Sequence, residues 1–312
     1  MRVLVTGAAG FIGSEVCRQL SGDGVSVRAV DCLLPDSYSA VEKQRSWNSL
    51  AGLRDIELVD FDLRQPVDKD LLEGIDVIIN EAGMPGLAKS WDEFEIYSSC
   101  NLSTVANLLS SASIGSKPHF VQISTSSVYG KDALGNESQV PLPVSPYGVT
   151  KLAAEELLKA YSRSFGVPYT ILRYFSVYGP GQRPDMAYRI FINDLLQDRP
   201  VKIFGDGSQS RTNTYVADCA RATIRAAFMP AKGSTYNIAG DTEATLLEAL
   251  RIIENILGRK AQIEFLERRA GDQLRTVGVT DKAQREIGFK SEIRLEEGLA
   301  NQVAWQKSTL LS

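Results

Sequence analysis

Short β-branched runs alternate with longer helical patterns over the first 175 residues, and this alternation limits the chain to one class of fold. The first run, RVLVTG, leads through glycines into a helical pattern at 11–22, and VSVRAVD, IELVDFD, DVIINEAG, HFVQIST and YTILRYF follow. Helical patterns at 67–74, 92–114 and 146–165 lie between later runs. Strands joined by helices build a parallel sheet with helices on both faces. We therefore predict an α/β fold with a doubly wound parallel sheet.

The alternation weakens after Phe175, where SVYGPGQRPD collects glycine and proline before a helical pattern near 185–198. The segments NTYVADCARATIRAAF and STYNIAG indicate a return to the sheet, followed by helices near 245–257 and 295–308 with AQIEFLE between them. This order predicts two domains. Residues 1–175 plus about 212–240 would form the sheet domain, and about 176–211 plus 241–312 a smaller, discontinuous C-terminal lobe.

Composition excludes several classes of function. The 312 residues carry a net charge of -4 with no long run of Lys or Arg, so we expect no nucleic-acid partner. One histidine and four scattered cysteines argue against a zinc site, a Ser-His-Asp triad and any other metal centre. No segment resembles a signal peptide or a membrane span. We expect a soluble cytoplasmic protein with reduced thiols and no membrane partner.

The first strand ends in TGAAGFIG, which supplies Gly7, Gly10 and Gly13 at the start of the first helix. Glycines at this spacing allow a tight turn and close approach of a pyrophosphate to the helix N-terminus. Asp31 ends the second strand, where a carboxylate can accept from a ribose 2′-hydroxyl; the alternative is a turn residue at a strand end. No Arg or Lys occupies 32–34, so the sequence favours NAD over NADP in a Rossmann-type domain.

The third strand is followed by DFDLR, which places Asp62 and Leu63 at the same edge of the sheet. An acidic group there can reach the adenine amine, and an aliphatic side chain can cover the ring. On spacing alone, Asp62 fits a plain turn residue equally well.

Two further motifs place hydroxyl and ammonium groups near that edge. In SPYGVTKLAAEELL, Ser145 and Pro146 start a helix, and Tyr147 and Lys151 lie one turn apart on one face. In ISTSSVYG, Thr125 comes at the end of the fifth strand. Each motif alone has a structural alternative, a surface Tyr-Lys pair and a turn or cap.

In this order, the glycine triplet, Asp31, Thr125 and the Tyr147–Lys151 pair resemble the extended short-chain dehydrogenase/reductase family. The resemblance is to its NAD-dependent nucleotide-sugar epimerases and dehydratases, and it covers about residues 2–307. It implies that Tyr147 is a general base, that Lys151 favours the ionised phenol and holds the nicotinamide ribose, and that Thr125 hydrogen-bonds the sugar hydroxyl being oxidised. By the same resemblance, Tyr147 and Lys151 also contact the cofactor. Further candidate cofactor contacts are Phe11, Ile12, Ala82, Asn101, Ser124 and Tyr174.

Departures within the family bear on the reaction. Related dehydratases carry an acid pair after the threonine, where this chain has Ser126 and Ser127, and many decarboxylases carry Glu at the position of Ser127. The run VYGPGQRPDMA is similar to that of the UDP-glucuronate 4-epimerases. This resemblance implies that Ser126, Ser127 and Ser176 hold the sugar carboxylate and that Arg183 supplies positive charge.

The resemblance also implies substrate contacts in the second lobe. Arg211 and Arg275 would clamp the diphosphate, the strand VKIF, with Lys202, Ile203 and Phe204, would lie against uracil, and Asp272 would bind a ribose hydroxyl. A solvated surface cation is the alternative for each arginine. Two positions depart from the family: Asn80-Glu81 replaces a His-Leu pair, and Thr212-Asn213 replaces an Asp-aromatic pair.

The leading hypothesis is therefore a UDP-glucuronate 4-epimerase that acts through a 4-keto intermediate with bound NAD. The main alternative is a decarboxylase that yields a UDP-4-keto-pentose or UDP-xylose. An epimerase for UDP-glucose or UDP-N-acetylglucosamine and a non-catalytic NAD-binding regulator are weaker alternatives. By resemblance we also expect a homodimer that pairs the helices near 92–114 and 146–165.

Overall fold

A computed structural model of the chain describes residues 1–35, 39–115, 117–268 and 273–310. Its centre is one sheet of seven strands, all of them parallel. Across the sheet the strands are β12 (Ser234–Ile238), β7 (Tyr169–Tyr174), β5 (His119–Thr125), β4 (Val77–Asn80), β1 (Arg2–Thr6), β2 (Ser26–Asp31) and β3 (Ile56–Asp60). This confirms the predicted α/β fold of the Rossmann type.

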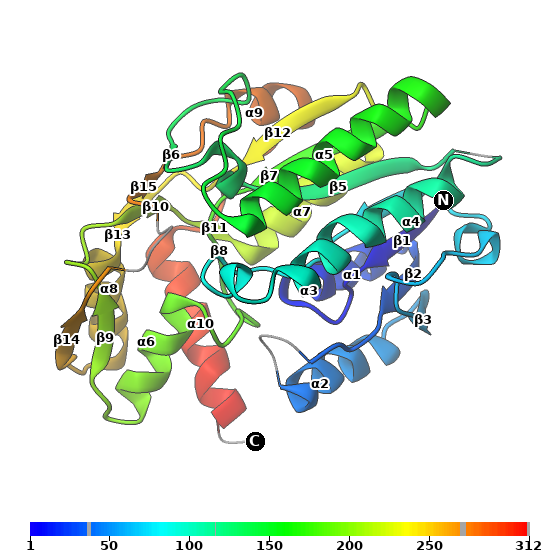
Figure 1. Cartoon of the computed structure of the whole chain (residues 1–312). Coiled ribbons are helices and arrows are strands. Elements are labelled where there is room, and N and C mark those ends of the chain that lie inside the picture. The colour runs from blue at the N-terminus through cyan, green and yellow to red at the C-terminus, as the bar shows by residue number, and fades with distance from the viewer. Residues whose placement is uncertain (36–38, 116, 269–272, 311–312) are drawn as a thin grey trace.

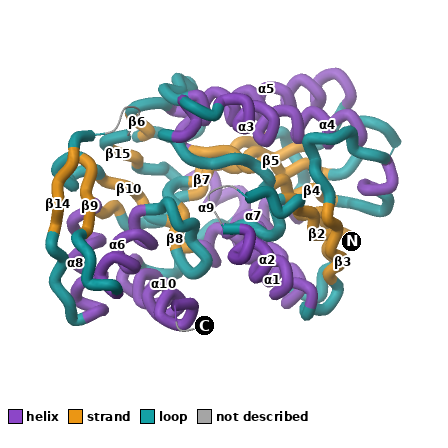
Figure 2. Tube along the Cα trace, turned by 60° about the horizontal axis from the view of Figure 1, so that its bottom comes forward, coloured by secondary structure: helices purple, strands orange, loops and turns teal. Residues whose placement is uncertain are grey.

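Alternate strand residues enter separate hydrophobic cores on the two faces of the sheet. Val3 and Val5 pack on one face, whereas Leu4, between them, packs on the other. The first face is covered by α1 (Phe11–Gly22), α2 (Ala40–Ala51), α7 (Val216–Phe228) and α9 (Asp281–Ile287). The second is covered by α4 (Thr104–Ala112) and α5 (Pro146–Phe165), with the short α3 (Phe94–Ser98) beside α5. Figure 2 shows α3, α4 and α5 on the opposite side of the sheet from α1 and α2.

Several elements differ from those expected from the sequence. The pattern over 92–114 forms one continuous helical run over 94–112, in which a wider helical turn at Ser99–Ser103 joins α3 to α4. Only a short 3-10 turn, Lys69–Leu72, forms within 67–74. The helices α2 and α9 were not expected. No helix in the described ranges is both long and apolar enough to cross a membrane.

Helices and short strands lie beside the carboxyl edge of the sheet (Figure 1), and these elements share a third hydrophobic core. It is built on three helices, α6 (Ala187–Leu196), α8 (Leu246–Leu257) and α10 (Leu295–Leu310). Short strand pairs complete this part of the chain: β9 (Val201–Phe204) with β14 (Ile263–Leu266), and β8 (Val177–Tyr178) with β11 (Thr214–Tyr215). A four-stranded sheet contains β13 (Glu243–Thr245), β10 (Ser210–Thr212), β15 (Arg275–Thr276) and β6 (Asp132–Ala133).

Candidate active site

A cleft of about 310 Å³ opens at the carboxyl ends of β1, β2, β4, β5 and β7, and we call it the first cleft. Ligands bind at this edge of open parallel sheets. The candidate cofactor residues named from the sequence all line it: Gly7, Gly10, Phe11, Ile12, Gly13, Asp31, Asp62, Leu63, Ala82, Asn101, Ser124, Tyr147, Lys151 and Tyr174. Thr125, Ser176 and Arg183 line it as well.

The glycine turn forms a cradle that no side chain could share. Gly7 has φ +63, and a Cβ there would lie 2.8 Å from the backbone nitrogen of Ala82; a Cβ on Gly13 would lie 2.3 Å from the Gly7 carbonyl oxygen. No side chain caps α1 at Gly10, and its first turn has no acidic residue. The N-terminal amides of α1 are thus suited to a diphosphate, and the cradle fits a dinucleotide.

Asp31 organises the end of the cleft where the sequence predicts the adenosine of the cofactor. Its two carboxylate oxygens accept hydrogen bonds from the backbone amides of Ala9, at 3.0 Å, and Leu33, at 2.8 Å. The Lys43 ammonium on α2 lies 3.6 Å from the same carboxylate. Lys43 could not be predicted from the sequence, because the polar α2 carries few apolar residues that would have placed the helix beside Asp31.

Asp62 and Leu63, which the sequence predicts to contact the adenine, both line the first cleft. Asp62 accepts from the backbone amide of Arg64 at 3.0 Å and pairs with its guanidinium, whose Nη2 lies 2.6 Å away. These bonds hold the pKa of the Asp62 carboxyl below its usual value. Leu63 is buried in the core that α4 and α5 cover.

Thr125, Tyr147 and Lys151 meet where β5 ends and α5 begins. Ser145 caps α5 by accepting from the Gly148 amide at 3.1 Å, which sets Tyr147 and Lys151 on successive turns facing the cleft. The side chain of Thr125, at the end of β5, acts on the Tyr147 phenol and lowers its pKa. Thr125 accepts from the Ser127 amide at 3.1 Å and donates to the Ser127 hydroxyl at 3.3 Å, and these two bonds hold its side chain in place.

Burial changes the pKa values of the charged groups at this junction. It raises the pKa of Tyr147, while the side chain of Thr125 and the positive charge of Arg183 act in the opposite direction. Burial lowers the pKa of Lys151 to about 8, although the negative charges of Glu81 and Glu155 oppose the change. Burial also raises the pKa of Glu81 to about 7, against a hydrogen bond from Tyr174 and the charge of Lys151.

The unusual Asn80-Glu81 pair belongs to two hydrogen-bonded chains. Asn80 accepts from the Thr6 hydroxyl at 2.6 Å and donates to the Gln122 side chain at 2.9 Å, which links β1, β4 and β5. Glu81 accepts from the Tyr174 hydroxyl at 2.8 Å, and that oxygen lies 2.5 Å from the Thr223 hydroxyl. The replacement of His-Leu thus places an acidic group on the wall of the cleft that Lys151 lines.

A buried ion pair supports Lys151 one turn further along α5. Glu155 accepts from the Arg173 guanidinium at 3.0 and 2.7 Å and from the Ser124 hydroxyl at 2.5 Å. The Arg173 guanidinium lies over the Tyr129 ring, 4.7 Å from its centre. Sequence analysis did not name Glu155 or Arg173; the four-residue spacing after Lys151 was the signal that could have indicated Glu155.

A second cleft of about 450 Å³ lies between α6, β9 and β10, and three residues of its wall, Ser176, Val177 and Met186, also line the first cleft. Ser176 adopts φ +29, an uncommon conformation for a residue other than glycine, at the point where the two clefts meet. The second cleft therefore opens into the first cleft, whose wall contains Thr125 and Tyr147.

Some of the predicted substrate residues line the two clefts, and others lie outside them. Lys202, Phe204 and Arg211 line the second cleft, and so does Arg268, which sequence analysis missed. Ile203 is fully buried in the core of α6, α8 and α10, because alternate residues of a strand face opposite sides. Arg275 is exposed and paired with Glu243 at 2.7 Å, outside both linings.

The remaining candidates are the serines after Thr125 and one aspartate. Neither Ser126 nor Ser127 is in the wall of a described cleft, since both belong to the short turn of helix that follows β5. Asp272 lies outside the described residues.

Residues 3–239 match the sequence model of the NAD dependent epimerase/dehydratase family. The chain belongs to this family. One family relative is the uncharacterized UDP-glucose epimerase YtcB of Bacillus subtilis, 40% identical over 99% of this chain and 98% of that protein. Another is a UDP-glucuronate 4-epimerase of Thermodesulfobacterium geofontis, 34% identical over 98% and 96%.

Solved structures agree with this family assignment. The UDP-glucuronic acid 4-epimerase of Bacillus cereus, in complex with UDP-glucuronic acid and NAD, superposes with a TM-score of 0.96. It is 36% identical in sequence, and the alignment covers 99% of this chain and all of that one.

Replacing Glu81 by glutamine is expected to change the pH dependence of catalysis. The substitution keeps an acceptor for Tyr174 but removes a negative charge that raises the pKa of Lys151. Lys151 would then lose its proton at lower pH, so the alkaline limb of kcat/KM should move down by roughly one pH unit. The measurement is the pH profile of kcat/KM for both enzymes.

The matched control is Thr223→Val, which removes the second partner of the Tyr174 hydroxyl and leaves the charge of Glu81 in place. Its alkaline limb should coincide with that of the wild type. An unchanged limb in Glu81→Gln, or one shifted to higher pH, would contradict this account.

Proposed function

We propose that this chain is a UDP-glucuronate 4-epimerase that keeps NAD bound through the catalytic cycle. The observation that carries the proposal is the junction of the two clefts at Ser176 and Met186, because the first cleft is also lined by Thr125 and Tyr147. A dinucleotide in the first cleft and a nucleotide sugar in the second would meet at this junction. The names of the relatives and the bound ligands of the Bacillus cereus enzyme support this assignment of the two clefts.

The side chains at the junction can move one proton. Tyr147 takes the proton of the sugar 4-hydroxyl as the carbonyl forms at C4, and Thr125 orients that hydroxyl. When bound in the first cleft, NAD would supply the acceptor for the hydride from C4 and the donor for its return to the other face. After the 4-keto sugar turns over, Tyr147 gives the proton back, so the reaction consumes no oxidant.

Tyr147 requires positive charge nearby to act as a base at neutral pH. Its burial raises the pKa of the phenol, and Arg183 opposes that effect. Lys151, one turn along the same helix, lines the cleft and adds a second cation while it stays protonated. A pKa of about 8 for Lys151 keeps it mostly charged at neutral pH.

Recognition of the sugar carboxylate separates epimerisation from decarboxylation. The 4-keto intermediate of a glucuronate is a β-keto acid, which loses carbon dioxide when its carboxylate bond lies perpendicular to the carbonyl plane. We assign the carboxylate to the Ser176 hydroxyl and the Arg183 guanidinium, which both line the first cleft at the junction. Asp185 holds Arg183 through two bonds, of 3.0 and 2.9 Å, so the cation is fixed in place.

The test is the product formed from UDP-glucuronate. We expect a product of unchanged mass with inverted configuration at C4, identified by mass spectrometry and proton NMR. Tyr147→Phe should lower the rate by about 10²–10⁴-fold, because the ring still packs while the base is lost. Tyr161→Phe is the matched control on the same helix: its hydroxyl lies 3.1 Å from that of Ser110, away from both clefts, and activity should persist.

Loss of carbon dioxide from UDP-glucuronate would instead identify a decarboxylase. A Tyr147→Phe enzyme with nearly the wild-type rate would remove Tyr147 from the mechanism, whichever product is formed.

We further propose that the enzyme is a cytoplasmic homodimer that pairs the helices near 92–114 and 146–165, which include α3, α4 and α5. Apolar side chains are exposed there: Trp91, Phe94 and Val149 are 55%, 49% and 48% exposed. All four cysteines are unpaired, as expected in a reducing compartment.

Light scattering at micromolar concentration should give the mass of a dimer. Val149→Glu should lower that mass, because it places a charge in the proposed interface. A monomeric wild type would refute the dimer.

A further inference from the structure

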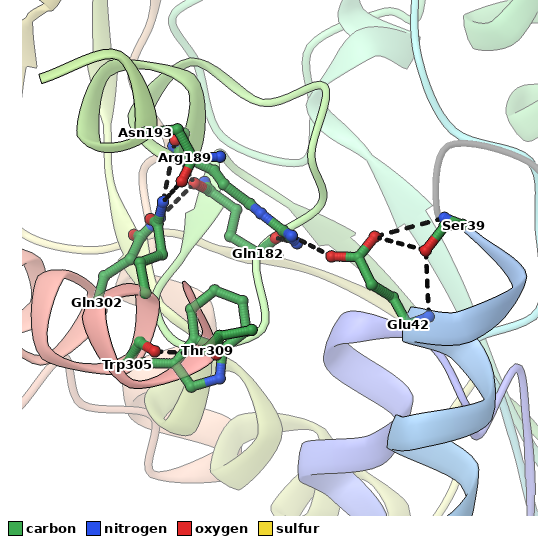
Figure 3. Close-up of polar contacts among 9 residues, drawn as sticks. Ser39, Glu42, Gln182, Arg189, Asn193, Gln302, Trp305 and Thr309 are labelled. Carbon is green, nitrogen blue, oxygen red and sulfur yellow. Dashed lines mark hydrogen bonds and ion pairs between the residues drawn. The ribbon is translucent and has the colours of Figure 1, made fainter. Parts of the chain in front are cut away.

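An ion pair joins the second lobe to the edge helix α2 of the sheet domain. The Arg189 guanidinium on α6 reaches the Glu42 carboxylate in the first turn of α2, across 147 residues of sequence (Figure 3). The side chains are 10% and 28% exposed, so the pair is partly shielded from water. Such a pair is less screened than one on the open surface.

Contacts within the second lobe fix the Arg189 side chain in the position from which it pairs with Glu42. Nη1 of Arg189 donates to the Gln182 carbonyl oxygen at 2.7 Å, and its guanidinium lies over the Trp305 ring, 5.2 Å from the centre. Gln302 on α10 donates to the Gln182 side chain at 2.7 Å (Figure 3). Because these contacts fix the cation in advance, little side-chain entropy is lost when it pairs with Glu42.

Glu42 in turn belongs to the helix start that borders the adenosine end of the first cleft. Its carboxylate lies 3.4 Å from the Ser39 amide, and Ser39 accepts from the Glu42 amide at 3.2 Å, which closes the capping box of α2 (Figure 3). The next residue, Lys43, lines the cleft and lies 3.6 Å from Asp31. The position of α2 therefore sets the position of Lys43 beside Asp31.

The same helix α6 also borders the second cleft, through Tyr188 and Phe191. Gln182, whose carbonyl holds Arg189, lines that cleft too. The contacts that fix Arg189 thus connect the wall of the nucleotide-sugar cleft to α2.

We infer that Arg189 and Glu42 are positioning residues for the cofactor: the second lobe, through this ion pair, holds α2 against the adenosine end and slows the release of NAD. The inference rests on the proposed binding of NAD in the first cleft. Neither side chain is in the wall of that cleft. Their effect passes through α2 and Lys43.

The test is the rate at which NAD leaves the purified holoenzyme. Glu42→Gln keeps an amide that can complete the capping box but loses the charge, so NAD should leave roughly five- to tenfold faster. Arg189→Gln should accelerate release to a similar degree, and the double variant should be no faster than either single one. The readout is the nucleotide that stays bound after timed ultrafiltration, released by heat and measured by chromatography.

Ser39→Ala is the matched control, since it weakens the same helix start and keeps the Glu42 carboxylate for Arg189. Its release rate should stay within about twofold of wild type. Unchanged release in both single variants, additive effects in the double variant, or a Ser39→Ala enzyme as fast as Glu42→Gln would overturn the inference. A wild type purified without any bound NAD would refute the proposed retention of the cofactor as well, so the two failures are distinguishable.

Discussion

The close approach of the β1–α1 turn to the end of β4 is the constraint on which both parts of the active site depend. A Cβ on Gly7 would lie 2.8 Å from the nitrogen of Ala82, so the diphosphate cradle and the segment after β4 form one packed unit. The same segment borders Lys151, whose ammonium would lie 3.7 Å from a Cβ on Gly83. Glu81 lies in the same segment, and its negative charge raises the pKa of Lys151. The proposed cofactor cradle and the proposed activation of the base would therefore share one short stretch of backbone.

One buried ion pair at the sheet edge joins two neighbouring elements. Glu155 on α5 pairs with Arg173 on β7, and both are almost completely buried. Removing one partner of such a pair leaves an uncompensated charge, so the pair holds α5 against the strands that carry Thr125. The second lobe is joined to this domain by the Arg189–Glu42 pair on the far side of the first cleft. The cleft thus has a rigid catalytic end and an adenosine end that depends on contact between lobes.

Sequence patterns predicted the strands that are buried on both faces, because such strands are continuous apolar runs. They also predicted α5, because that helix begins with a cap and a proline. They failed for α2, where Trp47 and Leu50 are the only large apolar side chains that are buried. They also assigned all of VKIF to uracil, although alternation turns Ile203 into the core. Contacts such as Tyr174–Glu81, 93 residues apart, depend on the folded sheet and leave no local pattern.

The central claim is that hydride leaves C4 of the sugar and returns to the same carbon without exchange. The most direct measurement is to convert UDP-glucuronate that carries deuterium at C4, in ordinary water, and to analyse the product by mass spectrometry and NMR. The account predicts that the C4 epimer retains all of the deuterium at C4, because the hydride never contacts solvent. Replacement of that deuterium by solvent hydrogen would contradict the account, since it would indicate removal of a proton from carbon.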